Sequence, residues 1–215
     1  MKKLTLLAVA AVVAPVANAA VIYDTLTGAY SNGNGNCLGG SAIFGQVNDL
    51  QVVDDFTIGT ATTITAVTVR NLTFGAASAT QGYLRIFDSG MNEITGPNGT
   101  LVAVSESGFS DTVFGLVGKD VRAGGLSIGL AAGTYWVGLQ AISDDWHYTA
   151  NGSYGKGANQ MGRDGNRGIG GYGTTDFFNM GTDTNMKIEG DVVPEPATMI
   201  ALGAGLAALA ARRRK

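Results

Sequence analysis

The chain of 215 residues has little of what most catalytic and metal sites are made from: it contains one His, one Cys and 4 Pro. With Cys37 as the single cysteine, no disulfide can form within the chain. One His and one Cys also cannot supply the usual ligand set of a zinc or iron site. Because 14% of the residues are charged and 45% are hydrophobic, the chain has enough apolar material for a folded core.

Positive charge is scarce in the middle of the chain. Six of the 14 Lys and Arg residues lie in the first three and last four positions, whereas 16 of the 17 acidic residues lie between Ala20 and Val193. The central region therefore carries 8 cations against 16 anions, a net charge of −8. Binding to phosphates requires a basic surface, so nucleic acid is not an expected partner.

Glycine, in contrast, is abundant, with 33 residues. It is concentrated in two stretches, Gly28–Gly40 and Asn151–Gly173. Such a composition predicts long surface loops, which in a compact domain are usually functional or mobile.

The N-terminus has the layout of an export signal. Two lysines precede an apolar run, Leu4–Ala14, and the small residues Ala17 and Ala19 follow. This order is typical of a secretory signal peptide, whose apolar run is too short to span a bilayer permanently. Residues 1–19 are therefore predicted to be a signal peptide with a helical core. Signal peptidase would cut after Ala19, so that the mature chain starts at Ala20.

A second three-part segment, residues 193–215, closes the sequence. Pro194, Glu195 and Pro196 are followed by an uncharged run from Met199 to Ala211 and by four basic residues, Arg212, Arg213, Arg214 and Lys215. The run is short for a bilayer, but basic side chains can snorkel to the interface. Cationic residues favour the cytoplasmic side, which leaves the upstream domain outside. The segment is predicted to be a short transmembrane helix with a basic membrane stop.

This C-terminal segment resembles the PEP-CTERM sorting signal of exported proteins in Gram-negative bacteria. The triplet, the apolar run and the arginine cluster occur in the family's order and spacing. The resemblance implies a transient anchor in the inner membrane, recognition and cleavage by an exosortase, a membrane cysteine transpeptidase, and delivery to the cell surface or the extracellular polysaccharide matrix. It implies a destination rather than an activity. The alternative is an ordinary single-pass anchor that stays uncut.

The region between the two end segments shows the periodicity of strands. In Leu126–Leu130 and in Tyr135–Ala141 apolar residues alternate, which places each set on one face of a half-buried strand. Turn residues separate such segments, and no window shows a convincing helical stripe. Residues 20–192 are therefore predicted to form one all-β domain, an antiparallel β-sandwich of the jelly-roll kind. The region is similar to a group of uncharacterised exported β-sandwich domains that precede PEP-CTERM tails.

One motif raises the question of catalysis. Ser127 lies at the centre of a G-x-S-x-G pattern, and Asp144, Asp145 and His147 follow in the chain order of an α/β-hydrolase triad. The nucleophile of that fold needs a strand, a sharp turn and a helix, whereas these residues have the pattern of one continuous strand. The protein is therefore predicted not to be an enzyme, and a secreted hydrolase is the second alternative for its function.

Paired carboxylates are the candidate metal ligands. Asp144 and Asp145 form one pair, and Asp54 and Asp55 form another. Calcium prefers such oxygen ligands, but no stretch has the spacing of a dedicated calcium loop. No cofactor is expected, and calcium at Asp144 and Asp145 is the one candidate.

Aromatic residues cluster where the strand alternation stops. Trp146, His147, Tyr148 and Tyr154 occur within nine residues. Aromatic rings stack on the apolar faces of sugars, so these residues are a candidate ligand face and an extracellular polysaccharide is a candidate partner. The predicted function is that of an exported structural or interaction protein. A carbohydrate-binding module is the first alternative.

Overall fold

The structure is a computed structural model that describes residues 19–30, 32–35, 37–41, 46–75, 78–97, 99–110, 115–144, 147–152, 157–164, 176–194 and 196–212. The predicted signal helix, including Ala17, lies outside the described residues. So do Glu195 of the triplet and the basic residues Arg213, Arg214 and Lys215.

The described chain is built almost entirely from strands. They are β1 (Ala20–Asp24), β2 (Asn32–Gly35), β3 (Cys37–Ser41), β4 (Gln46–Ile58), β5 (Thr62–Thr73), β6 (Gln81–Phe87), β7 (Thr100–Ser110), β8 (Val117–Leu130), β9 (Gly133–Ile142), β10 (His147–Gly152), β11 (Met161–Asp164), β12 (Phe178–Asn179), β13 (Asp183–Thr184) and β14 (Met186–Val192). One helix, α1 (Pro196–Arg212), follows them. The all-β class predicted from the sequence is confirmed.

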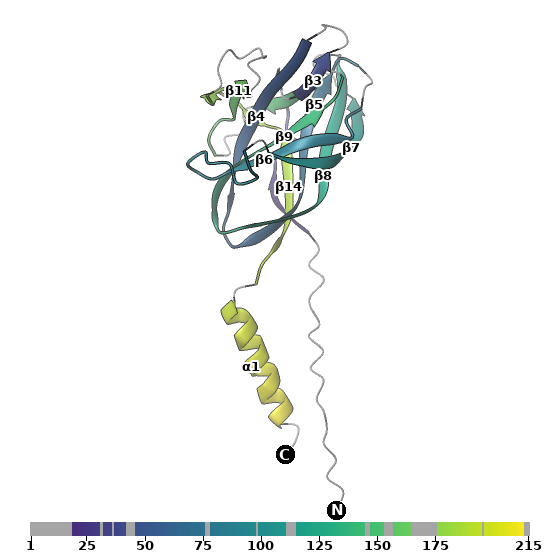
Figure 1. The fold of residues 1–215 in the computed structure, drawn as a ribbon. Coiled ribbons are helices and arrows are strands. Elements are labelled where there is room, and N and C mark those ends of the chain that lie inside the picture. Colours follow the sequence, from purple (N-terminus) through teal and green to yellow (C-terminus); the bar gives the residue numbers. More distant parts are fainter. Residues whose placement is uncertain are drawn as a thin grey trace, which may run out of the picture.

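The strands form one curled sheet whose two halves enclose a core (Figure 1). One half has the order β1-β14-β5-β8, and the other has the order β6-β9-β3-β4-β11-β12. Strand β7 joins the halves, because Thr100–Ala103 pairs with β6 and Val104–Ser110 pairs with β8. Pairing is antiparallel throughout the described strands except between β3 and β9. The sheet thus turns its corner within β7.

The core follows from the alternation of side chains along these strands. In β14, Met186 and Ile188 are fully buried while Lys187 and Glu189 lie on the other face. The same alternation in β8 leaves Ser127 exposed and buries Leu130. Both halves of the sheet contribute to one hydrophobic cluster, with β4, β6 and β9 on one side and β5, β8 and β14 on the other.

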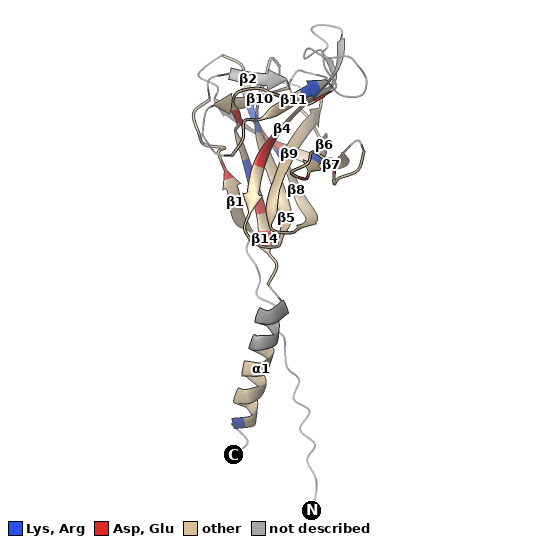
Figure 2. Cartoon of the chain, turned by 90° about the vertical axis from the view of Figure 1, so that its left-hand side faces the viewer, with Lys and Arg blue, Asp and Glu red and all other residues tan. Residues whose placement is uncertain are grey.

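Ion pairs link several strands of the sheet. Figure 2 shows few charged residues, scattered over the strands of the domain. In β8, Asp120 pairs with Arg70 of β5 at 2.8 Å and Lys119 pairs with Glu106 of β7 at 3.0 Å. Arg122 of β8 reaches across β5 to Glu189 of β14 at 2.8 Å.

The prediction of a long loop over Gly28–Gly40 was wrong. This stretch contains β2, which pairs with β10, and β3, which pairs with β4 and β9. A ladder of backbone hydrogen bonds needs no side chain, so distant partners can order a glycine-rich segment despite its low strand propensity. The second glycine-rich stretch, Asn151–Gly173, contains β11, and residues 153–156 and 165–175 lie outside the described residues.

Helix α1 has 17 residues and extends from the end of the domain (Figure 1). In the part of the chain that the structure describes, no helix combines the length and the apolar character that crossing a membrane requires. The transmembrane helix predicted for the C-terminal segment is therefore not confirmed.

Candidate functional site

The last strand of the domain runs directly into the predicted sorting triplet. β14 pairs with β5 up to Val192, and the N–H of Val193 donates to the carbonyl oxygen of Ala61 at 2.8 Å. Pro194 is exposed, and α1 begins at Pro196. Two residues therefore separate the last of these hydrogen bonds from the first residue of the helix.

The side chains of α1 that the structure describes are exposed to solvent. Proline fits the first turn, because its missing N–H would have no intrahelical partner there. Ala197–Ala211 contains no charge, and Arg212 stands in the last turn. Every residue from Gly203 to Arg212 is exposed, including Leu206 and Leu209 at 59% each. Apolar surface of this extent is unfavourable in water, so the helix is suited to a lipid or protein environment.

The predicted start of the mature chain lies beside the same strand. Ala20 pairs with Gly190 of β14, and Ala19 and Ala20 are exposed. Ala17, the third predicted cleavage residue, lies outside the described residues. From Gly190, β14 continues for two residues to Val192, and α1 begins at Pro196. The two predicted processing sites are therefore neighbours on the sheet.

His147 lies inside the domain rather than on the predicted ligand face. It is the first residue of β10 and is 0% exposed, and its Nδ1 lies 3.2 Å from the Nδ2 of Asn71. A side chain at this depth cannot stack on a ligand at the surface. Trp146 and Tyr154, which complete the predicted aromatic group, lie outside the described residues.

Tyr148 is half-buried. Its ring meets Phe74 edge to face, with the ring centroids 5.7 Å apart. Asp144, a predicted calcium ligand, is exposed, and Asp145 lies outside the described residues. Within the described ranges, no group of three or more His, Cys, Asp or Glu residues is arranged to hold a metal ion.

A group of buried carboxyl groups lies where β4 meets β13. Asp54, Asp55 and Asp183 are 0%, 5% and 3% exposed. Asp54 accepts hydrogen bonds from the backbone N–H of Thr184 at 2.6 Å and of Asp55 at 3.0 Å, and Asp55 accepts one from the N–H of Ala158 at 2.7 Å. These bonds join β4 to β13 and to the segment before β11.

Burial dominates the protonation of Asp54 and Asp55. The pKa of Asp54 is raised to about 8, with desolvation as the largest cause. The two backbone hydrogen bonds oppose this rise in part, and the nearby Asp183 and Asp55 add to it. Desolvation also raises the pKa of Asp55. Burial, followed by these same carboxylates, raises the pKa of Tyr23. Asp54 is therefore mostly protonated at neutral pH. The sequence showed the pair Asp54 and Asp55, but no local pattern indicated that Asp183 joins it.

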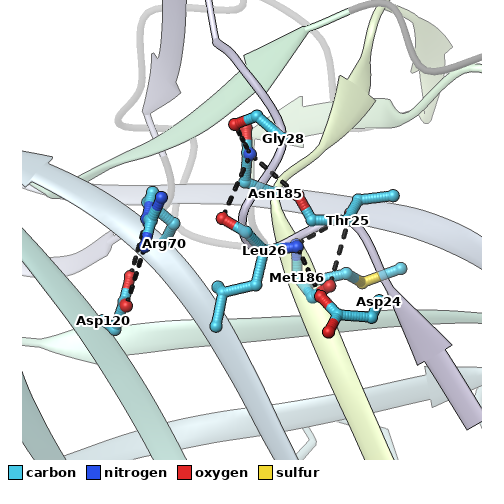
Figure 3. A network of polar contacts seen from close by, with 8 residues as sticks. All are labelled: Asp24, Thr25, Leu26, Gly28, Arg70, Asp120, Asn185 and Met186. Carbon is cyan, nitrogen blue, oxygen red and sulfur yellow. Dashed lines mark hydrogen bonds and ion pairs between the residues drawn. The ribbon is translucent and has the colours of Figure 1, made fainter. Parts of the chain in front are cut away.

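Two polar residues fasten the beginning of the domain to its end (Figure 3). The hydroxyl of Thr25 donates to the carbonyl oxygen of Thr184 at 2.6 Å and accepts from the N–H of Met186 at 3.0 Å. The amide of Asn185 donates to the carbonyl oxygens of Thr25 and Gly28, both at 2.9 Å. These contacts fix the segment after β1 to the segment before β14, about 160 residues later.

The Ser127 motif does not form a triad with His147. Ile128, next to Ser127, pairs with Ile64 of β5, whereas His147 pairs with Thr73 at the other end of β5. Nine residues of one strand span roughly 30 Å at about 3.3 Å per residue. Ser127 and His147 therefore lie at opposite ends of the sheet.

A surface groove of about 540 Å³ lies beside Ser127. Its described lining residues are Leu84, Ile94, Thr95, Thr100, Val102, Gly125, Leu126, Ser127, Ile128 and Gly129. None of these lining residues is an acid or a base that could activate the Ser127 hydroxyl.

Comparison with known proteins concerns the C-terminal segment. Residues 192–215 match the PEP-CTERM protein-sorting motif. The match starts at the last residue of β14, one residue before the boundary predicted from the sequence, and includes all of α1. No curated protein matches this sequence. The resemblance predicted from the triplet is confirmed: the chain carries a PEP-CTERM motif, consistent with an exosortase substrate, which implies export and cell-surface sorting in Gram-negative bacteria.

Proposed function

We propose that the protein is a structural or interaction component of the cell surface or extracellular matrix, held briefly at the inner membrane by α1 and released from it by exosortase cleavage near Pro194, Glu195 and Pro196. The observation that carries the proposal is the coincidence of two boundaries. The sorting motif begins at Val192, where the ladder of the domain ends. The domain can therefore stay intact when the tail is removed.

The exposure of α1 supports the transient anchor. At about 1.5 Å per residue, a helix of 17 residues is roughly 25 Å long, a few ångströms short of a hydrocarbon core of about 30 Å. Local thinning of the bilayer and snorkelling of basic side chains accommodate such a mismatch. A helix of this length holds the precursor and leaves the triplet close to the outer face of the membrane.

The interior of the domain supports a role without catalysis. The buried side chains of Thr25, Asn185 and Asp54 form hydrogen bonds with backbone groups. The Ser127 hydroxyl has neither His147 nor a carboxylate of its groove beside it. The polar groups described are thus used to hold the strands in register.

The sorting step is tested with Glu195→Ala in the bacterium that makes the protein. The variant should accumulate as full-length chain in the inner membrane fraction, because the enzyme that reads the triplet no longer cuts it. Asp144→Ala is the matched control, since it removes one negative charge from an exposed position outside the motif. Intact-mass spectrometry and membrane fractionation give the result. Normal cleavage and surface delivery of the Glu195 variant would refute the proposal.

A further inference from the structure

The edge of β14 next to the sorting triplet has no partner strand among the described residues. β14 pairs with β5 along its whole length, but β1 starts only at Ala20, opposite Gly190. In the described part of the chain, no strand lies on the β1 side of Asp191, Val192 and Val193. A short free edge therefore runs directly into the motif.

The backbone groups on this edge can be identified from the ladder. In an antiparallel pair, successive residues direct their N–H and C=O alternately to one neighbour and to the other. Because the N–H of Val193 bonds to Ala61 of the β5 side, the N–H and C=O of Val192 point away from β5. The side chains of Val192 and Val193 are 55% and 45% exposed. The edge thus offers apolar side chains together with one donor and one acceptor that have no partner among the described residues.

The register also shows why the mature chain cannot cover this edge. One further step of the β1–β14 ladder would place Ala19 opposite Asp191. Signal peptidase is predicted to cut between Ala19 and Ala20. After that cut, no residue of β1 is left to pair with Asp191, Val192 or Val193.

We infer that Asp191–Val193 is a docking strand for the processing enzyme, an inference that rests on the proposed exosortase sorting. An extended segment of the exosortase adds to the free edge of β14 through main-chain hydrogen bonds, as in other cases of recognition by strand addition. Pro194 has no N–H, and the N–H of Val193 is bonded to Ala61. The N–H of Val192 is therefore the first free backbone donor upstream of Glu195. Pairing there holds the triplet at a fixed distance from the enzyme.

The edge is tested with Val192→Pro in the full-length protein. Proline removes the outward N–H and leaves the inward N–H groups of Asp191 and Val193, and proline is tolerated where a strand N–H faces solvent. Tail cleavage, followed by pulse-chase labelling, should become about tenfold slower, the factor for one lost hydrogen bond of about 1.4 kcal/mol. Val192→Thr is the control, because it keeps the N–H and the branched side chain and should be cut at the original rate.

A second variant separates docking from folding. Insertion of Gly-Ser-Gly-Ser between Val193 and Pro194 leaves the ladder intact but uncouples it from the triplet, and it should slow cleavage by a similar factor. Thermal unfolding of the full chain in detergent should be unchanged in both variants.

The outcomes distinguish docking from sorting. If both variants are cut at the original rate while Glu195→Ala is blocked, the docking edge is overturned and the sorting function stands. If Glu195→Ala is also cut normally, the sorting function itself fails. Equal slowing by Val192→Thr would assign the effect to the side chain and overturn the backbone pairing.

Discussion

Asp54 shows how one buried carboxyl group can make stability depend on pH. It accepts two backbone hydrogen bonds, yet it is 0% exposed and close to Asp55 and Asp183. Removal from water disfavours the charged form more strongly than the two donors favour it, which is why the pKa rises to about 8. The interior thus holds a proton at neutral pH that the unfolded chain would release.

This proton gives a prediction for the pH dependence of folding. The pKa of Asp54 is 3.8 in the unfolded chain and about 8 in the folded one, so the folded state binds the proton more tightly. The resulting stabilisation is complete below about pH 4 and is lost as the pH rises through about 8. The temperature at the midpoint of thermal unfolding should therefore decrease as the pH is raised from about 6 to about 9. Circular dichroism at several pH values measures it.

Asp54→Asn is the informative variant, because its side chain cannot ionise. Its unfolding midpoint should change less over the same pH range than that of the original protein. An original protein that becomes more stable from about pH 6 to pH 9 would contradict the assignment. A variant with an unchanged slope would assign the dependence to another group, such as Asp55, whose pKa burial also raises.

At the scale of the element, β9 depends on a glycine at a close crossing of two strands. β9 pairs with β4 only from Gly133 to Val137. At the next residue, Gly138, a Cβ atom would overlap the carbonyl oxygen of Val52 and lie 3.0 Å from the Cγ1 of Val53. The absent side chain allows the backbone of β4 to pass directly over β9.

Gly138→Ala is therefore expected to destabilise the domain. Because the obstacle is backbone rather than a movable side chain, the free energy of unfolding should fall by about 1–3 kcal/mol. Gly129→Ala in β8 is the matched control: nothing lies within 4 Å of the added Cβ, and its effect should be within about 0.5 kcal/mol. Urea unfolding of both variants makes the comparison. Equal effects of the two substitutions would show that strand propensity, rather than the crossing, determines the result.

For the whole molecule, the important feature is that both ends of the domain meet on neighbouring strands. Ala20 pairs with Gly190, two residues before β14 ends. An uncut signal peptide would therefore hold the protein to the membrane from the same end as α1. The two predicted cleavages would release one and the same end of the domain.

Ala19→Arg tests this arrangement. A large cation next to the predicted cleavage site should block signal peptidase, so that the protein stays in the inner membrane even when its tail has been removed. Thr27→Arg, at an exposed position of the mature chain, should be exported normally. Intact-mass spectrometry of the surface fraction should find a first residue of Ala20 in the control. Surface protein that still contains residues 1–19 would contradict the prediction.

Local patterns could be predicted from the sequence, and contacts between distant residues could not. The sorting triplet is a linear motif, and the alternation around Leu126 and Leu130 is a property of neighbours, so both were visible. The hydrogen bond from Thr184 to Asp54 joins residues 130 positions apart, which no local pattern encodes. The sequence predicted a surface position for His147, because local composition does not show which strands pack around a residue. Its place beside Asn71 is set by the pairing of β10 with β5.

The position of β14 within the sheet determines how the domain would bear mechanical load. In the proposed function, a surface attachment made near Pro194 would pull on β14 along its own axis. The hydrogen bonds to β5 on one side and to β1 on the other lie across that axis, so they are sheared together rather than opened one after another. The hydroxyl of Thr25 and the amide of Asn185 add bonds at the far end of the strand. Tension from an anchored end would thereby be shared by the hydrogen bonds of both ladders of β14 before any single bond breaks.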